Sequence, residues 1–97
     1  MPAITSLSAT PEAGRLIKRL CTHWGHKFSV KFDDKHGVVQ FDDAVVLRLQ
    51  AHADALHARI DAIDLPALER FQGVVENHLQ RMARAGALSF DWQPASD

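Results

Sequence analysis

Hydrophobic and polar side chains alternate through residues 28–60, which read FSVKFDDKHGVVQFDDAVVLRLQAHADALHARI. A period of two is typical of strands that bury one face. Turn-forming residues interrupt the alternation at 33–37 (DDKHG), at 42–43 (DD) and at 52–54 (HAD). The segment therefore predicts four sequential strands in an antiparallel meander, whose first turn is a hairpin with Gly37 at positive φ. One face of this sheet is expected to be apolar and the other mostly polar.

Apolar residues recur with helical spacing on both sides of this meander. Before it, Thr10-Pro11-Glu12 predicts a helix start with Thr10 as the cap, and Gly25 predicts the end. The apolar stripe of this helix consists of Ala13, Leu16, Ile17, Leu20 and Trp24. After the meander, Asp64-Leu65-Pro66 predicts the start of a second helix that ends at Gly86. Its stripe consists of Leu68, Phe71, Val75, Leu79 and Met82, with Gly73 inside the helix as a sign of close packing or as a tolerated glycine.

The ends of the chain predict two further strands. Residues 3–9 (AITSLSA) are rich in small and β-branched side chains and predict an edge strand, and residues 88–92 (LSFDW) alternate as a last strand. The predicted order is β-α-β-β-β-β-α-β. Each helix has one stripe to bury and the sheet has one apolar face, so we expect both helices on that face. The result is an α+β fold that resembles the plan of TATA-box-binding-protein-like proteins, with residues 1–97 as a single domain.

Composition narrows the classes of function. The formal net charge of −1 argues against nucleic-acid binding, which needs a basic surface. Charge is nevertheless uneven, because residues 1–31 hold five Lys or Arg against one Glu, whereas residues 32–64 hold seven Asp against three Lys or Arg. A single cysteine, no secretory signal pattern and no apolar run of about 18 residues lead us to expect a cytoplasmic protein without a membrane span.

A histidine-rich corner provides the first candidate site. Cys21, His23, Trp24 and His26 lie near the end of the first helix, and His78 flanks the stripe of the second. Thiolate and imidazole ligate zinc, copper and iron, but on an intact helix Cys21 and His23 point about 200° apart. His23 and His26 share a side, and His78 can join them if the helices pack side by side. We predict instead that His23 and His78 are mostly buried and structural, with no bound metal or cofactor.

Three other groups of residues have open interpretations. Cys21 beside a histidine could be a nucleophile pair, but no Gly-rich oxyanion loop or orienting Asn or Asp accompanies it. The aromatic residues Trp24, Phe28 and Trp92 are in phase with the core, so core packing is favoured over a pocket for a flat ligand. On the outer sheet face, two arginines could bind a carboxylate or catecholate, remain solvated, or join Val38 and Val46 in a dimer surface. That face is expected to contain Arg48, His57, Arg59 and Asp61.

Residues 20–27 (LCTHWGHK) are similar to a bacterial family known as domain of unknown function 2218. Further similar features are the acidic turn with Gly37, the segments 54–57 (DALH) and 74–79 (VVENHL), and the closing Asp91-Trp92. The chain departs from the family after the second helix, where residues 81–86 (RMARAG) replace an aromatic-containing segment. Related domains are joined to flavin-dependent siderophore-interacting reductases, so the resemblance implies a link to iron–siderophore handling.

These features lead us to expect a non-enzymatic accessory or small-ligand-binding protein, a homodimer, with a siderophore-related molecule or a reductase as its partner. The first alternative is a small metal- or heme-binding protein that uses the histidine cluster. The second is a thiol enzyme that uses Cys21 and a histidine.

Overall fold

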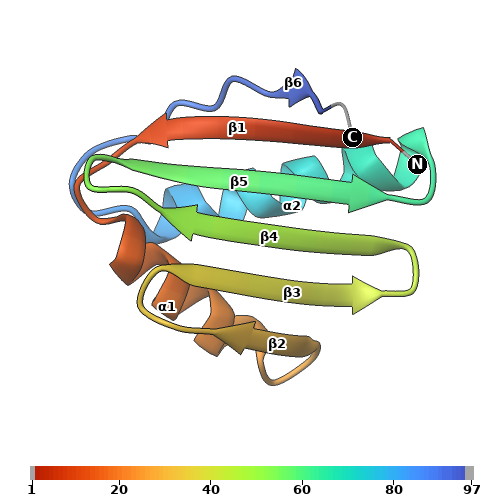
Figure 1. Ribbon diagram of the computed structural model, residues 1–97, viewed down its shortest axis with the longest axis horizontal. Helices are drawn as coiled ribbons and strands as arrows, with labels where there is room; N and C mark the ends of the chain where they lie inside the picture. Colours follow the sequence, from red (N-terminus) through yellow and green to blue (C-terminus); the bar gives the residue numbers. More distant parts are fainter. Residues whose placement is uncertain (1, 96–97) are drawn as a thin grey trace.

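The computed structural model describes residues 2–95 (Figure 1). Its elements follow the predicted order, with two helices and six strands. They are β1 (Ala3–Ala9), α1 (Ala13–Trp24), β2 (Ser29–Phe32), β3 (His36–Asp42), β4 (Val45–Ala51), β5 (Ala55–Ala62), α2 (Leu65–Met82) and β6 (Gln93–Pro94). None of the helices within residues 2–95 is long and apolar enough to cross a membrane.

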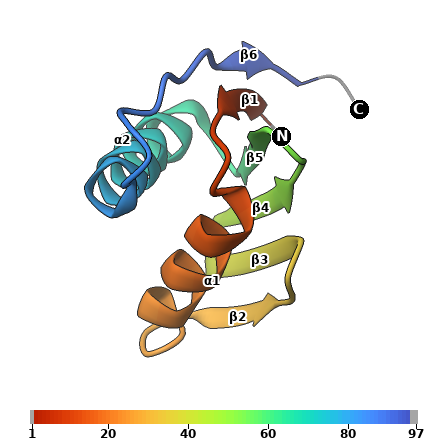
Figure 2. The same cartoon turned by 90° about the vertical axis from the view of Figure 1, so that its left-hand side faces the viewer.

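The strands form one antiparallel sheet in the order β2-β3-β4-β5-β1-β6. Strand β1 therefore lies between β5 and the two-residue β6 rather than at an edge, which corrects the edge-strand prediction. Figure 2 shows both helices on one side of the sheet. This arrangement confirms the predicted α+β fold with both helices on one face.

The core lies between the sheet and the two helices. The predicted stripe of α1 is buried throughout, from Ala13 to Trp24, whereas in α2 only Leu68, Val75 and Leu79 are buried. On the sheet, the buried side chains alternate with more exposed ones along β3, β4 and β5, as the period of two predicts. The central pair Leu47 and Ile60 is fully buried.

The two helix starts differ in how well the sequence predicts them. Asp64 caps α2 as expected, because its carboxylate accepts a hydrogen bond from the Ala67 N–H at 2.9 Å. Helix α1 begins at Ala13, and no side chain caps it. Thr10 lies two residues before the cap position, where its hydroxyl accepts a bond from the Glu12 N–H at 3.2 Å. The prediction of Thr10 as the cap is therefore wrong.

Gly37 has a different role from the one predicted. It lies inside β3, paired with Phe32 and Leu49, and the only glycine at positive φ within residues 2–95 is Gly86. A Cβ at Gly37 would come 2.8 Å from Cys21 Sγ and 3.0 Å from Ile17 Cγ2. The glycine is required because α1 packs directly on this strand, not because the turn needs an unusual backbone conformation.

The segment after α2 is mostly irregular, which corrects the predicted last strand at 88–92. The helix ends at Met82, four residues before Gly86. The Leu88 N–H and carbonyl both bond to the side-chain amide of Gln80, and the Asp91 N–H donates to the Ser6 hydroxyl at 3.0 Å. Because side chains take these backbone groups, strand pairing with β1 begins only at Gln93.

Candidate functional site

A pocket of about 450 Å³ opens where the end of α1, the middle of α2 and β3 meet. We call it the aromatic pocket because ring side chains form most of its wall. Its lining consists of Trp24, Phe28, Phe41 and Phe71, the histidines His23, His26 and His78, the cations Lys27 and Arg70, and Val74. Four of the predicted candidates, namely Trp24 and the three histidines, therefore lie together at one site.

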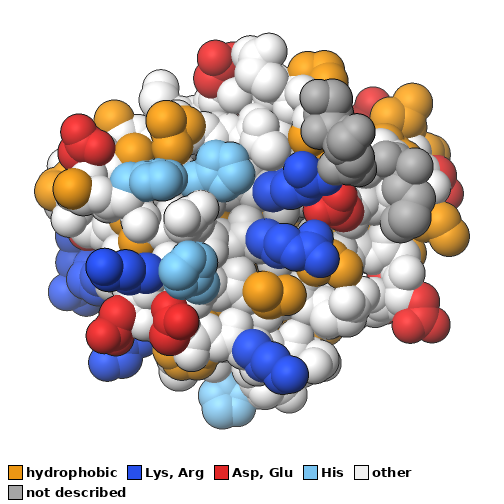
Figure 3. Space-filling model, viewed as in Figure 1, with side chains coloured by type: hydrophobic (Ala, Val, Ile, Leu, Met, Phe, Trp, Pro, Cys, Tyr) orange, Lys and Arg blue, Asp and Glu red, His pale blue; other side chains and the backbone are white. Residues whose placement is uncertain are grey.

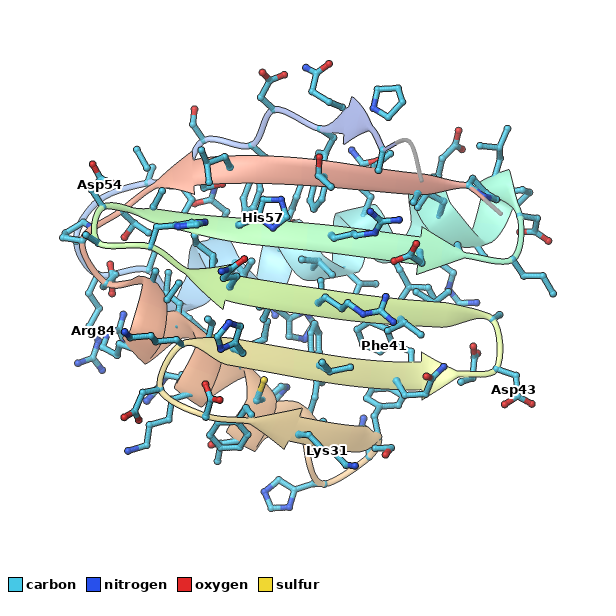
Figure 4. All side chains as sticks on the ribbon, viewed as in Figure 1. Lys31, Phe41, Asp43, Asp54, His57 and Arg84 are labelled. Carbon is cyan, nitrogen blue, oxygen red and sulfur yellow. The ribbon has the colours of Figure 1, made fainter. Side chains whose placement is uncertain are left out.

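Phe41 holds the aromatic wall together. Its ring centroid is 4.8 Å from that of Trp24 and 5.0 Å from that of Phe28, both edge-on, and 4.6 Å from that of Phe71. These distances are within the range of favourable aromatic contacts. Phe41 points from β3 to the helix side of the sheet (Figure 4). The wall is thus built by one ring from the sheet and by rings from both helices and the loop after α1.

The helices do bring His23 and His78 together, with ring centroids 5.5 Å apart, and His78 also lies 4.9 Å from the Trp24 ring. His23 is exposed and His78 is half-buried, so the prediction that both are mostly buried is wrong for His23. His78 Nδ1 donates to the Val74 carbonyl of its own helix at 2.8 Å. In the neutral ring this bond leaves Nε2 as an acceptor beside the aromatic pocket.

Two cationic side chains line the aromatic pocket. Arg70 lies over the face of the Phe71 ring, with 5.6 Å from its guanidinium carbon to the ring centroid, and Lys27 adds a second cation. No Asp or Glu of the described chain belongs to the lining. Apolar ring faces beside two cations favour a flat ligand that has a negative charge.

Cys21 does not join the pocket. Its side chain is fully buried on the inner side of α1, next to Gly37. Burial raises the pKa of its thiol to about 11, so almost no thiolate exists at neutral pH. A nucleophilic role needs a thiol that is both accessible and ionised, and the thiol of Cys21 is neither.

The remaining candidates lie on the opposite face of the sheet. Arg48 and Arg59 are direct cross-strand neighbours, and both bond to Asp61 at 3.0 Å. Figure 3 shows basic side chains and histidines gathered on this face, and Figure 4 places His57 and Lys31 on it. Burial, followed by the positive charges of His52 and Arg59, lowers the pKa of His57 below its ordinary value. The shared carboxylate of Asp61 already pairs with both guanidinium groups.

No group of three or more His, Cys, Asp or Glu side chains in residues 2–95 is placed to hold a metal ion. Cys21 is buried next to Gly37, so the pocket offers imidazole groups alone, those of His23, His26 and His78. The histidine cluster therefore supplies a polar rim for the aromatic pocket rather than a closed coordination sphere.

Sequence reasoning missed half of this site. Phe41 and Phe71 follow the apolar periodicity of the core, so the sequence pattern does not distinguish them, at the edge of the core layer, from residues inside it. Arg70 and Lys27 follow no spacing that points to a ligand. The one available signal is the adjacency of Arg70 and Phe71 in a helix whose neighbouring turns contain Val74 and His78.

Comparisons with known proteins agree with the architecture. A family model described as "Uncharacterized protein conserved in bacteria (DUF2218)" matches residues 5–93. A solved NMR structure, that of PA4090 from Pseudomonas aeruginosa, is 40% identical, covers 100% of both chains and superposes with a TM-score of 0.83. No curated protein matches the sequence.

Proposed function

The chain belongs to the DUF2218 family of bacterial proteins, and from this premise we propose that it is a non-enzymatic binding protein whose aromatic pocket holds a small aromatic anion. The observation that carries the proposal is the meeting of four aromatic rings and two cations at one pocket. A volume of about 450 Å³ accommodates a single substituted ring.

The shape of the pocket selects a flat molecule. Phe41 and Phe71 lie 33° from parallel, whereas Trp24 and Phe28 meet Phe41 edge-on. A ligand ring that enters this corner gains both face and edge contacts, each of which adds about 0.5–1.5 kcal/mol beyond the buried area.

The charge of the pocket selects an anion. Arg70 has a guanidinium group that can bind a carboxylate through two parallel hydrogen bonds, and Lys27 offers a point charge. The free Nε2 of His78 can accept a hydrogen bond from a hydroxyl group on the ring. An aromatic carboxylate with a neighbouring hydroxyl group satisfies all three side chains.

This chemistry fits the catecholate groups of siderophores. The family resemblance, with related domains joined to siderophore-interacting reductases, makes a catecholate the first ligand to test. The proposed role is that of an accessory protein in iron–siderophore metabolism, with the reductase or the siderophore as the partner. A homodimer is part of the same proposal, with Leu7 and Val38 exposed at 59% and 39% on the outer sheet face.

Trp24 provides a direct readout of occupancy. In a Trp92→Phe background, Trp24 is the single tryptophan, and 2,3-dihydroxybenzoate should quench its fluorescence with saturation. Arg70→Gln should weaken the apparent affinity by about tenfold, a loss of ~1.4 kcal/mol. The matched control is Arg81→Gln, which removes the same charge from the last turn of α2 outside the aromatic pocket. The proposal is refuted if the quenching does not saturate up to about 10 mM ligand, a dissociation constant that corresponds to a binding free energy near −2.7 kcal/mol. It is also refuted if Arg70→Gln and Arg81→Gln lose equal affinity.

A further inference from the structure

A second concavity, of about 510 Å³, lies along the exposed side of α1 where the chain leaves α2. Figure 2 shows the end of α2 beside α1. We call it the basic groove. Its wall on α1 consists of Arg15, Lys18, Arg19, Thr22 and His23, and its opposite wall of Met82 and Arg84. Four cations thus converge on one hollow, although the whole chain has a net charge of −1.

The helix geometry creates the first wall. Positions 15, 18, 19 and 22 have the spacing i, i+3, i+4 and i+7, so their side chains form one stripe. Like charges three and four residues apart repel each other in an isolated helix. The stripe is therefore unfavourable for the helix by itself, and a bound anion would remove that repulsion.

Glu12 fixes the second wall. Its carboxylate accepts hydrogen bonds from the backbone N–H groups of Arg84, at 2.8 Å, and Ala85, at 2.5 Å. The same carboxylate pairs with Arg15, whose Nη2 also donates to the Met82 carbonyl at 2.6 Å. These bonds hold the segment after α2 against the start of α1, so both walls are in place before any ligand arrives.

Glu12 pairs with one of the four cations, and no acidic side chain of the described residues lines the groove. Arg15 is paired with it, and no ion pair links Lys18, Arg19 or Arg84 to a carboxylate within the described residues. The groove thus has three cations without a counter-charge, together with the Thr22 hydroxyl as a further donor. Guanidinium and ammonium groups arranged in this way bind oxyanions through charge-assisted hydrogen bonds.

We infer that the basic groove is a binding site for a small multivalent oxyanion, a molecule with two or more phosphate or carboxylate groups. Its three unpaired cations match such a charge, and they surround a hollow of about 510 Å³, which has the size of a compact ligand rather than of a nucleic-acid duplex. The site is separate from the aromatic pocket, since only His23 lines both. The inference consequently does not depend on the proposed function.

Titration calorimetry at a constant ionic strength of about 0.15 M tests the inference with pyrophosphate and with citrate as separate probes. Saturable binding of at least one of them is expected, and the tighter probe identifies phosphate or carboxylate as the preferred group. Lys18→Gln/Arg19→Gln should weaken that binding by about tenfold or more, equivalent to ~1.4 kcal/mol. Both side chains are exposed, so this variant should fold as the wild type does.

The matched control is Lys31→Gln/Lys35→Gln, which removes two charges elsewhere on exposed positions and should bind the probe as the wild type does. Equal weakening in both double variants would overturn the inference, because bulk charge alone would then explain the binding. Failure of both probes to saturate would also overturn it, as would binding of a duplex oligonucleotide through Lys18 and Arg19 without binding of either probe. Quenching of Trp24 by 2,3-dihydroxybenzoate should be unchanged in Lys18→Gln/Arg19→Gln, which separates this test from that of the aromatic pocket.

Discussion

Two glycines that look alike in the sequence have opposite environments. A Cβ at Gly37 would come 2.8 Å from Cys21 Sγ, whereas a Cβ at Gly73 would meet nothing within 4 Å. Gly37→Ala should therefore lower the free energy of unfolding by about 1–3 kcal/mol through overpacking. Gly73→Ala should raise it by about 0.5–1 kcal/mol, because alanine is the better helix former. Urea denaturation of both variants measures the pair, and equal effects would contradict the packing of α1 on β3.

His57 should make stability depend on pH in the weakly acidic range. Burial and the charges of His52 and Arg59 lower its pKa in the folded protein below the ordinary 6.5. Above that pH the ring is neutral in both states and contributes nothing. As the pH falls below 6.5, the unfolded chain binds a proton that the folded chain resists, so the free energy of unfolding decreases. The decrease ends once the pH is below the folded pKa.

Denaturant melts at pH 7.5 and 5.5 test this prediction. The wild type should lose more stability between these values than His57→Gln, and His26→Gln, at an exposed position, is the control that should follow the wild type. Asp61 does not interfere, because its pKa is lowered from 3.8, mainly by the hydrogen bond from Arg59, and its contribution is lost only at still lower pH. A loss of equal size in all three proteins would contradict the assignment to His57.

The packing of each helix on the sheet should depend on one fully buried leucine. Leu20 on α1 and Leu79 on α2 both have no exposed surface. Leu20→Ala and Leu79→Ala should each lower the free energy of unfolding by about 2–5 kcal/mol, because each leaves a cavity against the sheet. Leu65→Ala, at a side chain that is 62% exposed, is the control and should cost far less. Losses under about 0.5 kcal/mol at both buried sites would contradict the packing of two helices on one face.

The order of the two helices and of strands β2 to β5 was predictable because each of them carries its own periodic pattern. The alternation in residues 28–60 and the stripe from Ala13 to Trp24 both survive in the structure, as does the Asp64 cap. The last strand was not predictable, because LSFDW alternates as a strand does. Tertiary hydrogen bonds prevent residues 88–92 from pairing as a strand, because the Gln80 amide and the Ser6 hydroxyl bond to the backbone of this segment.

For the whole molecule, the site depends on contacts that no local pattern encodes. The meeting of His23 and His78 could be anticipated from two stripes on adjacent helices. The roles of Phe41 and Arg70 could not be anticipated. The pocket forms only where the helix layer and the sheet end, and no sequence pattern indicates that position. The basic groove likewise depends on Glu12 and Arg84, which are 72 residues apart in the chain. The homodimer and the single domain over residues 1–97 stay predictions, and light scattering in solution tests the first.

The proposed function requires that the aromatic pocket binds an aromatic anion. The chain has two tryptophans, and their indole N–H groups give separate signals in a two-dimensional ¹⁵N–¹H NMR spectrum. Trp24 lines the pocket, whereas the Trp92 N–H donates to Glu76 at 3.0 Å and lies outside the lining. Titration with 2,3-dihydroxybenzoate should shift the Trp24 signal with saturation and leave the Trp92 signal in place. If the Trp24 signal does not move, or if both signals move together in proportion to added ligand, the claim is contradicted.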